Sequence, residues 1–263
     1  MVSEAAGQRV PGAEVRRARP AMGTVVSVHV HDDAPGATID AAIEAVFAEI
    51  EALEQVLSTF RPDSVISRIN RGELHLLDAG AEVTEVMDAC TWLEHHSEGA
   101  FTARRPDGSG RLDPAGFAKG WITERAARQL DDAGLSHWYV GAGGDVITRG
   151  SPAQGRRWRV GVAHPLTPGA VVATLELDGG AVATSGTAER GRHLWDGRTG
   201  DAAHALASIT VVGPELAWAD AFATAAFALG GAGLTWVRRF AGYEALAVTL
   251  EGAIERTPGF VVE

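Results

Sequence analysis

Hydrophobic positions recur along the first half of the chain with two different periods. Residues 24–32 alternate between apolar and polar, which is typical of a half-buried strand. Residues 39–57 place apolar side chains every three to four positions, and residues 83–95 do the same after a polar segment at 58–73. The pattern predicts a strand, a long amphipathic helix, an ordered loop and a second helix, in that order.

The second half of the chain adds more strands and two more helices. The predicted segments are a helix at 113–134, strands on both sides of a glycine turn at 136–150, two strands within 157–178, a strand at 204–214, a helix at 216–231 and short strands within 244–262. Helices and neighbouring strands interleave without a strict βαβ alternation. We therefore predict an α+β fold with mixed, largely antiparallel sheets and packed helices, rather than a doubly wound parallel sheet.

A length of 263 residues lies between one large domain and two small ones. Residues 1–20 are polar, contain glycine and proline and carry several arginines, so we expect a flexible N-terminal extension there. Residues 21–263 are expected to form a single domain. The N-terminal segment lacks the apolar core of a signal peptide, and no later run reaches the ~18 apolar residues of a membrane span. We therefore expect a cytoplasmic protein without membrane insertion.

Composition and charge narrow the classes of partner. Hydrophobic residues make up 46% and charged residues 22%, as in ordinary globular proteins. The 34 acidic residues outnumber the 23 basic ones and give a net charge of −11, which excludes nucleic acid as a broad partner. An anionic ligand must then be held locally by backbone N–H groups, a metal ion or a few cations. The single cysteine, Cys90, excludes an internal disulfide and a thiolate-rich metal centre.

Lys119 is the only lysine among the 23 basic residues. It follows Asp113 by six positions, at the entry to a predicted helix, where free N–H groups and the helix dipole favour anions. Glycines at 116 and 120 permit a ligand to approach the backbone closely. An exposed helix start with a solvated lysine fits the same spacing equally well.

Asp220 and Thr224 are four positions apart in a largely apolar helix, so they share one face. A carboxylate and a hydroxyl on such a face are a suitable fragment of a site for Mg²⁺, which prefers oxygen ligands. The alternative is an aspartate in the first turn with a threonine bonded back to its own helix. On spacing alone this second interpretation is the more common one.

A glycine-rich stretch from Ser185 to Gly200 holds an unusual density of polar groups, including Arg190, His193 and Asp196. His193 is the natural general base if a hydroxyl must be deprotonated, since the ordinary pKa of histidine lies near neutrality.

The cluster Gly141-Ala-Gly-Gly144 follows an apolar strand, as a dinucleotide-binding fingerprint would. It fails as such a fingerprint because a second β-rich segment follows it in place of a helix. We predict a turn between strands, with Asp145 as an acceptor within the turn.

Eight short motifs occur in one order along nearly the whole chain. They are Met22-Gly-Thr24, Ser58-Thr-Phe-Arg-Pro-Asp-Ser64 with Ser67 and Asn70, Gly99-Ala-Phe-Thr102, Asp113 to Gly120, Gly143-Gly-Asp145, Thr184-Ser-Gly186, His193-Leu-Trp-Asp196 with Thr199-Gly200, and Ala219-Asp-Ala-Phe-Ala-Thr224. Together these motifs closely resemble the FAD:protein FMN transferases, the ApbE family of flavin transferases. The resemblance implies the T-fold-like α+β architecture of that family.

The resemblance also implies an activity. Members hold FAD with Mg²⁺, cleave its pyrophosphate, and attach FMN through a phosphoester bond to a Thr or Ser hydroxyl of a target flavoprotein, releasing AMP. Such phosphoryl transfer depends on charge neutralisation and positioning, which a metal ion and a cation such as Lys119 supply. An FAD pyrophosphatase that releases FMN and AMP, and a non-catalytic FAD-binding protein, are the two alternatives.

The resemblance assigns roles to individual positions. The residues that match the FAD-binding positions are Met22, Phe60, Ala100, Phe101, Thr102, Asp113, Lys119 and Trp195. The carbonyl of Gly116 and the side chains of Asp220 and Thr224 match the metal site. His193 matches the histidine that activates the acceptor hydroxyl, so His193 and Asp220 are the expected catalytic residues.

Three positions depart from the usual family pattern. Gly197 stands where proline is common, Ala142 where asparagine is frequent, and Thr102 where aspartate is usual. The change at Thr102 affects the expected contact to the adenosine side of FAD, while the metal and histidine positions are intact.

Overall fold

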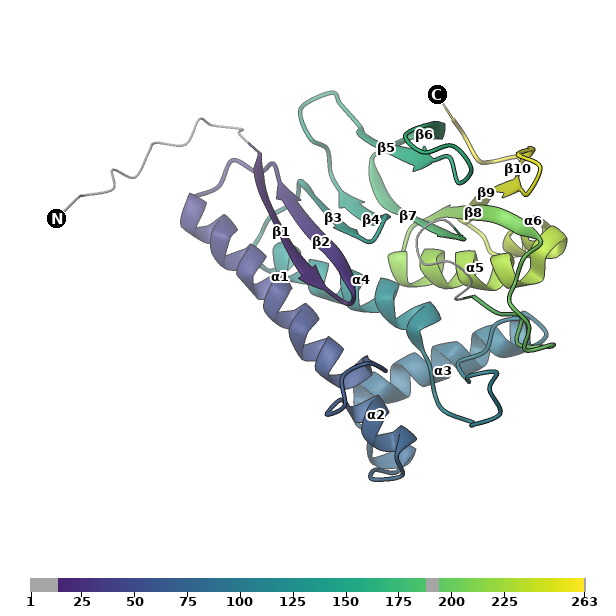
Figure 1. The fold of residues 1–263 in the computed structure, drawn as a ribbon. Coiled ribbons are helices and arrows are strands. Elements are labelled where there is room, and N and C mark those ends of the chain that lie inside the picture. Colours follow the sequence, from purple (N-terminus) through teal and green to yellow (C-terminus); the bar gives the residue numbers. More distant parts are fainter. Residues whose placement is uncertain (1–13, 188–193, 263) are drawn as a thin grey trace.

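The structure is a computed structural model that describes residues 14–187 and 194–262 (Figure 1). The strands are β1 (Val15–Ala21), β2 (Thr24–Val30), β3 (Trp138–Ala142), β4 (Asp145–Arg149), β5 (Trp158–Ala163), β6 (Val171–Leu177), β7 (Gly179–Gly186), β8 (Leu206–Gly213), β9 (Glu244–Thr249) and β10 (Ile254–Arg256). The helices are α1 (Gly36–Leu57), α2 (Val65–Asn70), α3 (Ala81–His96), α4 (Ala115–Asp132), α5 (Leu216–Leu229) and α6 (Gly233–Val237), with 3-10 turns at Leu76–Asp78 and Gly230–Ala232.

Eight of the strands form one sheet in the order β1-β2-β3-β4-β7-β8-β9-β10. Every neighbouring pair in this sheet is antiparallel. Strands β5 and β6 pair with each other as a separate antiparallel hairpin. The predicted α+β class with largely antiparallel sheets is confirmed.

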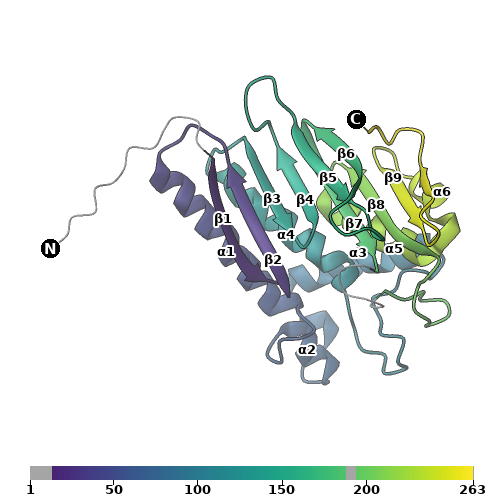
Figure 2. The same ribbon diagram turned by 45° about the horizontal axis from the view of Figure 1, so that its top comes forward.

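The sheet separates two hydrophobic layers. Figure 1 shows α1, α4 and α5 on one face, where Val26, Val28 and Val30 of β2 share a core with Ile39 and Ile43 of α1. Figure 2 shows the β5–β6 hairpin over the other face, above β7 and β8. The side chains beneath the hairpin form a second cluster, which includes Val146, Val160, Val162, Leu175, Val182 and Leu246. The central strands are therefore covered on both sides.

Two expectations about the first 73 residues need correction. Residues 15–20 belong to β1, which pairs with β2 along its whole length, so the flexible extension predicted for 1–20 is wrong for that part. The predicted loop at 58–73 contains the short helix α2, whose first turn is capped by Ser64 Oγ accepting the Ser67 N–H at 3.0 Å. Residues 1–13 lie outside the described part of the chain.

Two tight turns lie at the same end of the sheet. Met22 and Gly23 join β1 to β2 with φ of 52° and 68°, and Gly143 and Gly144 join β3 to β4 with φ of 57° and 90°. A Cβ on Gly143 would lie 2.8 Å from Thr24 Oγ1, so the two turns touch. The prediction of a glycine turn between strands is confirmed, and this turn sets the position at which β4 begins.

None of the described helices combines the length and the apolar character that crossing a membrane requires.

Candidate active site

The charged centre of the candidate site joins α4, α5 and β4. The Lys119 ammonium donates a hydrogen bond to Asp145 Oδ2 and lies 3.2 Å from Asp220 Oδ1. The side chains of Asp145 and Asp220 are only 1% and 4% exposed, whereas that of Lys119 keeps 23%. The lysine predicted as a phosphate or FAD contact thus lies between two buried carboxylates.

The second oxygen of each carboxylate accepts a backbone hydrogen bond. The Gly120 N–H of α4 donates to Asp220 Oδ2 at 2.9 Å, and the Thr184 N–H of β7 donates to Asp145 Oδ1 at 2.9 Å. Because each carboxylate is fixed by a neighbouring element, each turns its remaining oxygen toward the same ammonium.

Helices α4 and α5 touch at Gly120. A Cβ at this position would lie 2.7 Å from the Leu216 carbonyl oxygen and 2.8 Å from Asp220 Cβ, so a side chain would push the helices apart. In a regular helix the Gly120 N–H would donate a hydrogen bond to the Gly116 carbonyl. The bond from the Gly120 N–H to Asp220 Oδ2 ties α4 to α5.

The residues predicted to hold a metal are brought together. Thr224 Oγ1 lies 3.3 Å from Ser185 Oγ, and a Cβ on Gly116 would lie 3.1 Å from Thr224 Cγ2. Asp220 and Thr224 therefore bond to α4 and β7, which contradicts the alternative of a pair engaged only with its own helix. Carboxylate, hydroxyl and carbonyl oxygens are suitable ligands for Mg²⁺, so the donor set fits a hard divalent cation.

The candidate metal site depends on oxygen atoms of several kinds. Within residues 14–187 and 194–262 no cluster of three His, Cys, Asp or Glu side chains is arranged to hold a metal ion. The predicted set of Asp220, Thr224 and the Gly116 carbonyl includes only one side chain of these four types.

The balance of burial and neighbouring charges raises the pKa values of both Asp220 and Lys119. Burial, together with the neighbouring Asp145 carboxylate, raises the pKa of Asp220 above its usual range, although Lys119 opposes this shift. Burial alone would lower the pKa of Lys119, but Asp145 and Asp220 outweigh it and raise that pKa. Lys119 is therefore firmly cationic at neutral pH.

Asp113 forms the other end of the site, just before α4. Arg105 Nε lies 3.4 Å from Asp113 Oδ2, whereas Oδ1 is buried without a hydrogen-bond partner. Burial raises the pKa of Asp113, and the positive charge of Arg105 opposes that rise. A buried carboxylate oxygen without a donor is typical of a site that a ligand completes, in line with the predicted FAD contact.

Asn70 at the end of α2 fixes the segment that leads to Asp113. Its Nδ2 donates to the Leu112 carbonyl at 2.9 Å, and its Oδ1 accepts the Leu112 N–H at 2.7 Å. The Asp113 N–H in turn donates to the Ala103 carbonyl at 2.7 Å. Motifs that are some 40 residues apart in the sequence are thereby joined at one edge of the site.

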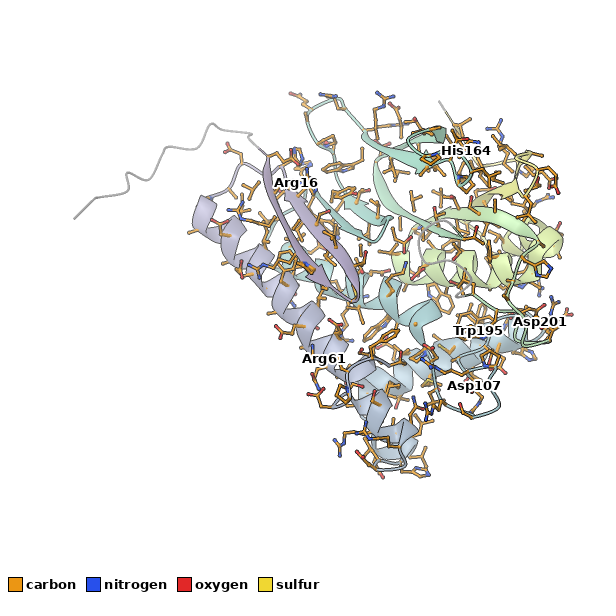
Figure 3. The ribbon with its side chains drawn as sticks, in the orientation of Figure 1. Arg16, Arg61, Asp107, His164, Trp195 and Asp201 are labelled. Carbon is orange, nitrogen blue, oxygen red and sulfur yellow. The ribbon has the colours of Figure 1, made fainter. Side chains whose placement is uncertain are left out.

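The loop that carries Trp195 packs on the segment 99–102. The Gly197 N–H donates to the Ala100 carbonyl at 2.9 Å, and a Cβ on Gly197 would lie 2.7 Å from Thr102 Cγ2. Figure 3 shows Trp195 and Asp107 on the same side of the molecule, near α3. The departures at Thr102 and Gly197 are therefore in direct contact and form one local feature, and Ala100, Thr102 and Trp195 belong to one region.

The remaining predicted FAD-binding residues differ in their exposure. Phe101 is 3% exposed, and its ring covers Gly116, where a Cβ would lie 2.9 Å from Phe101 Cε2. Phe60 is 86% exposed in the segment between α1 and α2. The Met22 N–H donates to Glu54 Oε2 at 3.3 Å. The contacts found among the described residues do not connect Phe60 with the charged centre, and its role stays a prediction.

His193, the predicted base, lies outside the described residues, as does Arg190. Leu194 follows directly, and its carbonyl accepts the Ala203 N–H at 2.9 Å. The role of His193 therefore stays a prediction.

Three further side chains belong to the site, although no role in it was predicted for them. Asp145 does not act as a turn acceptor, because its oxygens bond to Lys119 and Thr184. Ser185 contacts Thr224, and Arg105 contacts Asp113. The available signal for Asp145 was a carboxylate at the head of an otherwise apolar strand, where a buried charge requires a partner.

These features define an α+β protein with a buried, oxygen-rich polar site at the crossing of two helices. The model of the ApbE family matches residues 22–105 and 102–247, which together span most of the chain. The chain therefore belongs to the ApbE family.

Relatives and solved structures agree with this assignment. The chain is 26% identical to the FAD:protein FMN transferase of Treponema pallidum (strain Nichols), with 97% of this chain and 90% of the relative covered. It is also 26% identical to the protein of the same name from Haemophilus influenzae, over 80% of this chain and 79% of the relative. The fold matches the ApbE protein of Thermotoga maritima with a TM-score of 0.81 at 23% identity, covering 94% of this chain and 98% of that one. The flavin transferase ApbE of Vibrio cholerae matches with a TM-score of 0.82 at 21% identity, covering 94% and 97%.

Proposed function

We propose that this protein is a Mg²⁺-dependent FAD:protein FMN transferase that attaches FMN to a Thr or Ser hydroxyl of an acceptor flavoprotein and releases AMP. The observation that carries the proposal is the buried Asp220 at the α4–α5 crossing, with Thr224 one turn further along α5 and packed against Gly116, in a chain of the ApbE family. The names of the curated relatives supply the substrate and the transferred group.

The chain's own residues have separate tasks in this reaction. Asp220, Thr224 and the Gly116 carbonyl would hold Mg²⁺, which when bound neutralises charge on the pyrophosphate. Asp113 offers a free acceptor oxygen to the nucleotide. The adjoining segment 100–102 and the loop of Trp195, which bonds to it, would supply further contacts to FAD. His193 takes the proton from the acceptor hydroxyl. The hydroxyl oxygen then bonds to the phosphorus of the FMN half while the bond to AMP breaks.

Mass and AMP release together test the proposal. The purified protein is incubated with FAD, Mg²⁺ and a domain that carries a Ser/Thr flavinylation motif, and both products are followed. A mass gain equal to FMN on the acceptor, with one AMP per FMN, supports transfer. Release of AMP without labelling of the acceptor would instead indicate an FAD pyrophosphatase, and neither product would indicate a non-catalytic FAD-binding protein.

The proposed role of His193 has its own test. His193→Ala should slow transfer by roughly 10²–10⁴-fold, which is the usual contribution of a general base, while FAD stays bound. His204→Ala is a matched control, because His204 is exposed and lies in the same part of the chain. Full activity of His193→Ala would remove it from the mechanism. The cytoplasmic location expected from the sequence likewise stays a prediction, which cell fractionation would test.

A further inference from the structure

Lys119 is held differently from a lysine that awaits a phosphate. Its ammonium bonds to Asp145 and lies 3.2 Å from Asp220 Oδ1. Two buried carboxylates without a cation would be costly, because each would lose its water and keep only one backbone N–H donor, with no positive charge to balance it. The ammonium therefore makes burial of Asp145 and Asp220 tolerable.

The hydrogen bonds leave one oxygen of Asp220 for a metal. Oδ2 accepts the Gly120 N–H at 2.9 Å, so Oδ1 is the oxygen that remains, and Oδ1 is the one facing Lys119. Asp145 is bonded in the same way, since its Oδ1 accepts the Thr184 N–H and its Oδ2 accepts a hydrogen bond from Lys119. Two carboxylates and one ammonium sum to a net charge of −1, which still attracts a divalent cation.

We propose that Lys119 is the internal counter-ion of the Asp145–Asp220 pair, and that its ammonium and the divalent cation compete for Asp220 Oδ1. Lys119 is thus a positioning residue that holds Asp220 ready in the metal-free protein and lowers the affinity for the metal. When the metal binds, the bond to Asp145 keeps the ammonium paired. This proposal rests on the metal site of the proposed function.

Binding of Mn²⁺ to the full chain without FAD tests the competition directly. We expect Lys119→Met to bind Mn²⁺ roughly tenfold or more tightly than the wild type, because a neighbouring positive charge has been removed. The melting temperature of Lys119→Met in EDTA should fall below that of the wild type, and Mn²⁺ should restore most of the loss. Unchanged Mn²⁺ affinity, with FAD binding weakened, would overturn the proposal and leave Lys119 as a nucleotide contact.

Two further variants keep the test decisive if Lys119→Met folds poorly. In Asp145→Asn the ammonium has only Asp220 as a charged partner, so Mn²⁺ should bind several-fold more weakly. In Lys119→Met/Asp145→Asn one charge of each sign is removed, so the melting temperature in EDTA should rise above that of Lys119→Met. Equal Mn²⁺ affinity of Asp145→Asn and the wild type would contradict the counter-ion role.

Transfer is measured separately from metal binding, so that the two proposals fail in different ways. Competition for Mn²⁺ without any FMN transfer would contradict the proposed function alone. FMN transfer by the wild type, together with equal Mn²⁺ affinities of the wild type and Lys119→Met, would contradict the counter-ion proposal alone.

Discussion

At the α4–α5 crossing, each oxygen of Asp145 and Asp220 has a donor or a cation from the protein itself. At the start of α4, by contrast, Asp113 Oδ1 is buried without a donor. The first region is a closed set of charges that stays stable without a ligand. The second is incomplete, and a donor from the nucleotide would satisfy it. Changes in the first region should therefore affect folding stability and the proposed metal site, whereas changes in the second should affect nucleotide binding.

The largest effect is expected from Asp220→Ala in the closed region. This change removes the only carboxylate of the proposed metal set, so Mg²⁺-dependent turnover should fall by at least roughly 10²–10³-fold, the scale of one lost electrostatic stabiliser. AMP release at saturating Mg²⁺ measures it. Glu215→Ala is the matched control, because Glu215 precedes the same helix and is exposed. Full Mg²⁺-dependent activity of Asp220→Ala would show that the metal assignment is wrong.

Gly120→Ala should disturb the same region through packing. The new Cβ would meet the Leu216 carbonyl oxygen at 2.7 Å, so α4 and α5 must separate, and the unfolding free energy should fall by roughly 1–3 kcal/mol. Denaturant unfolding measures this change. Gly36→Ala is the control, since a Cβ there meets nothing within 4 Å. Equal stability of the two variants would mean that the helix contact does not constrain the site.

Gly197→Pro restores the residue that is common in the family, at a position near the incomplete region. It removes the N–H that donates to Ala100, worth about 1 kcal/mol, and puts a Cβ 2.4 Å from the Gly99 carbonyl oxygen. We expect a lower melting temperature and weaker FAD binding. Gly197→Ala keeps the N–H and adds the same Cβ, so the difference between the two variants measures the lost hydrogen bond together with the backbone restraint of the proline ring. A stabilised Gly197→Pro would show that Thr102 and Gly197 are not coupled.

Asp113→Asn should have the smallest effect on stability, and one of opposite sign. Because burial raises the folded-state pKa of Asp113, the folded state binds more protons, and this carboxyl lowers stability as pH rises from about 4 through the raised pKa. The amide should therefore raise the unfolding free energy at pH 7, at the low end of the roughly 0.5–2 kcal/mol of a typical stabilising change. At pH 3 the gain should vanish, while FAD binding weakens at neutral pH.

Asp107→Asn is the control for Asp113→Asn. Asp107 is exposed in the same loop, and its hydrogen bonds with Ser109 lower its pKa. Its replacement removes the same charge but should give no stability gain at pH 7. An equal gain in both variants would mean that net charge, and not burial, is responsible.

The sequence was sufficient to predict the elements that bury a regular apolar face. Helix α1 and strand β2 follow from their periodicity, because burial of one face imposes it. Strand β1 could not be predicted in this way. Its central residues are exposed and include Arg16, Arg17 and Arg19, and it is held to β2 by backbone pairing that leaves no hydrophobic pattern. Helix α2 is only six residues long, too short for a periodicity to show.

In the candidate site, too, the contacts set by local geometry could be predicted, whereas those between distant segments could not. The stacking of Asp220 over Thr224 is local, since helix geometry alone sets it. The pairing of Lys119 with Asp145 spans 26 residues and depends on where the Gly143–Gly144 turn starts β4, which spacing along the chain does not reveal. The contact between Gly197 and Thr102 likewise depends on two loops that meet only in the folded chain.

The uniqueness of Lys119 has a practical consequence for chemical labelling. It carries the only ε-amino group in 263 residues, so an amine-selective acylating reagent has this one side-chain target. Acylation needs the neutral amine, which the two carboxylates disfavour by raising the pKa of Lys119. The rate of acylation at this one residue would therefore report how often the charged centre opens, with no background from other lysines.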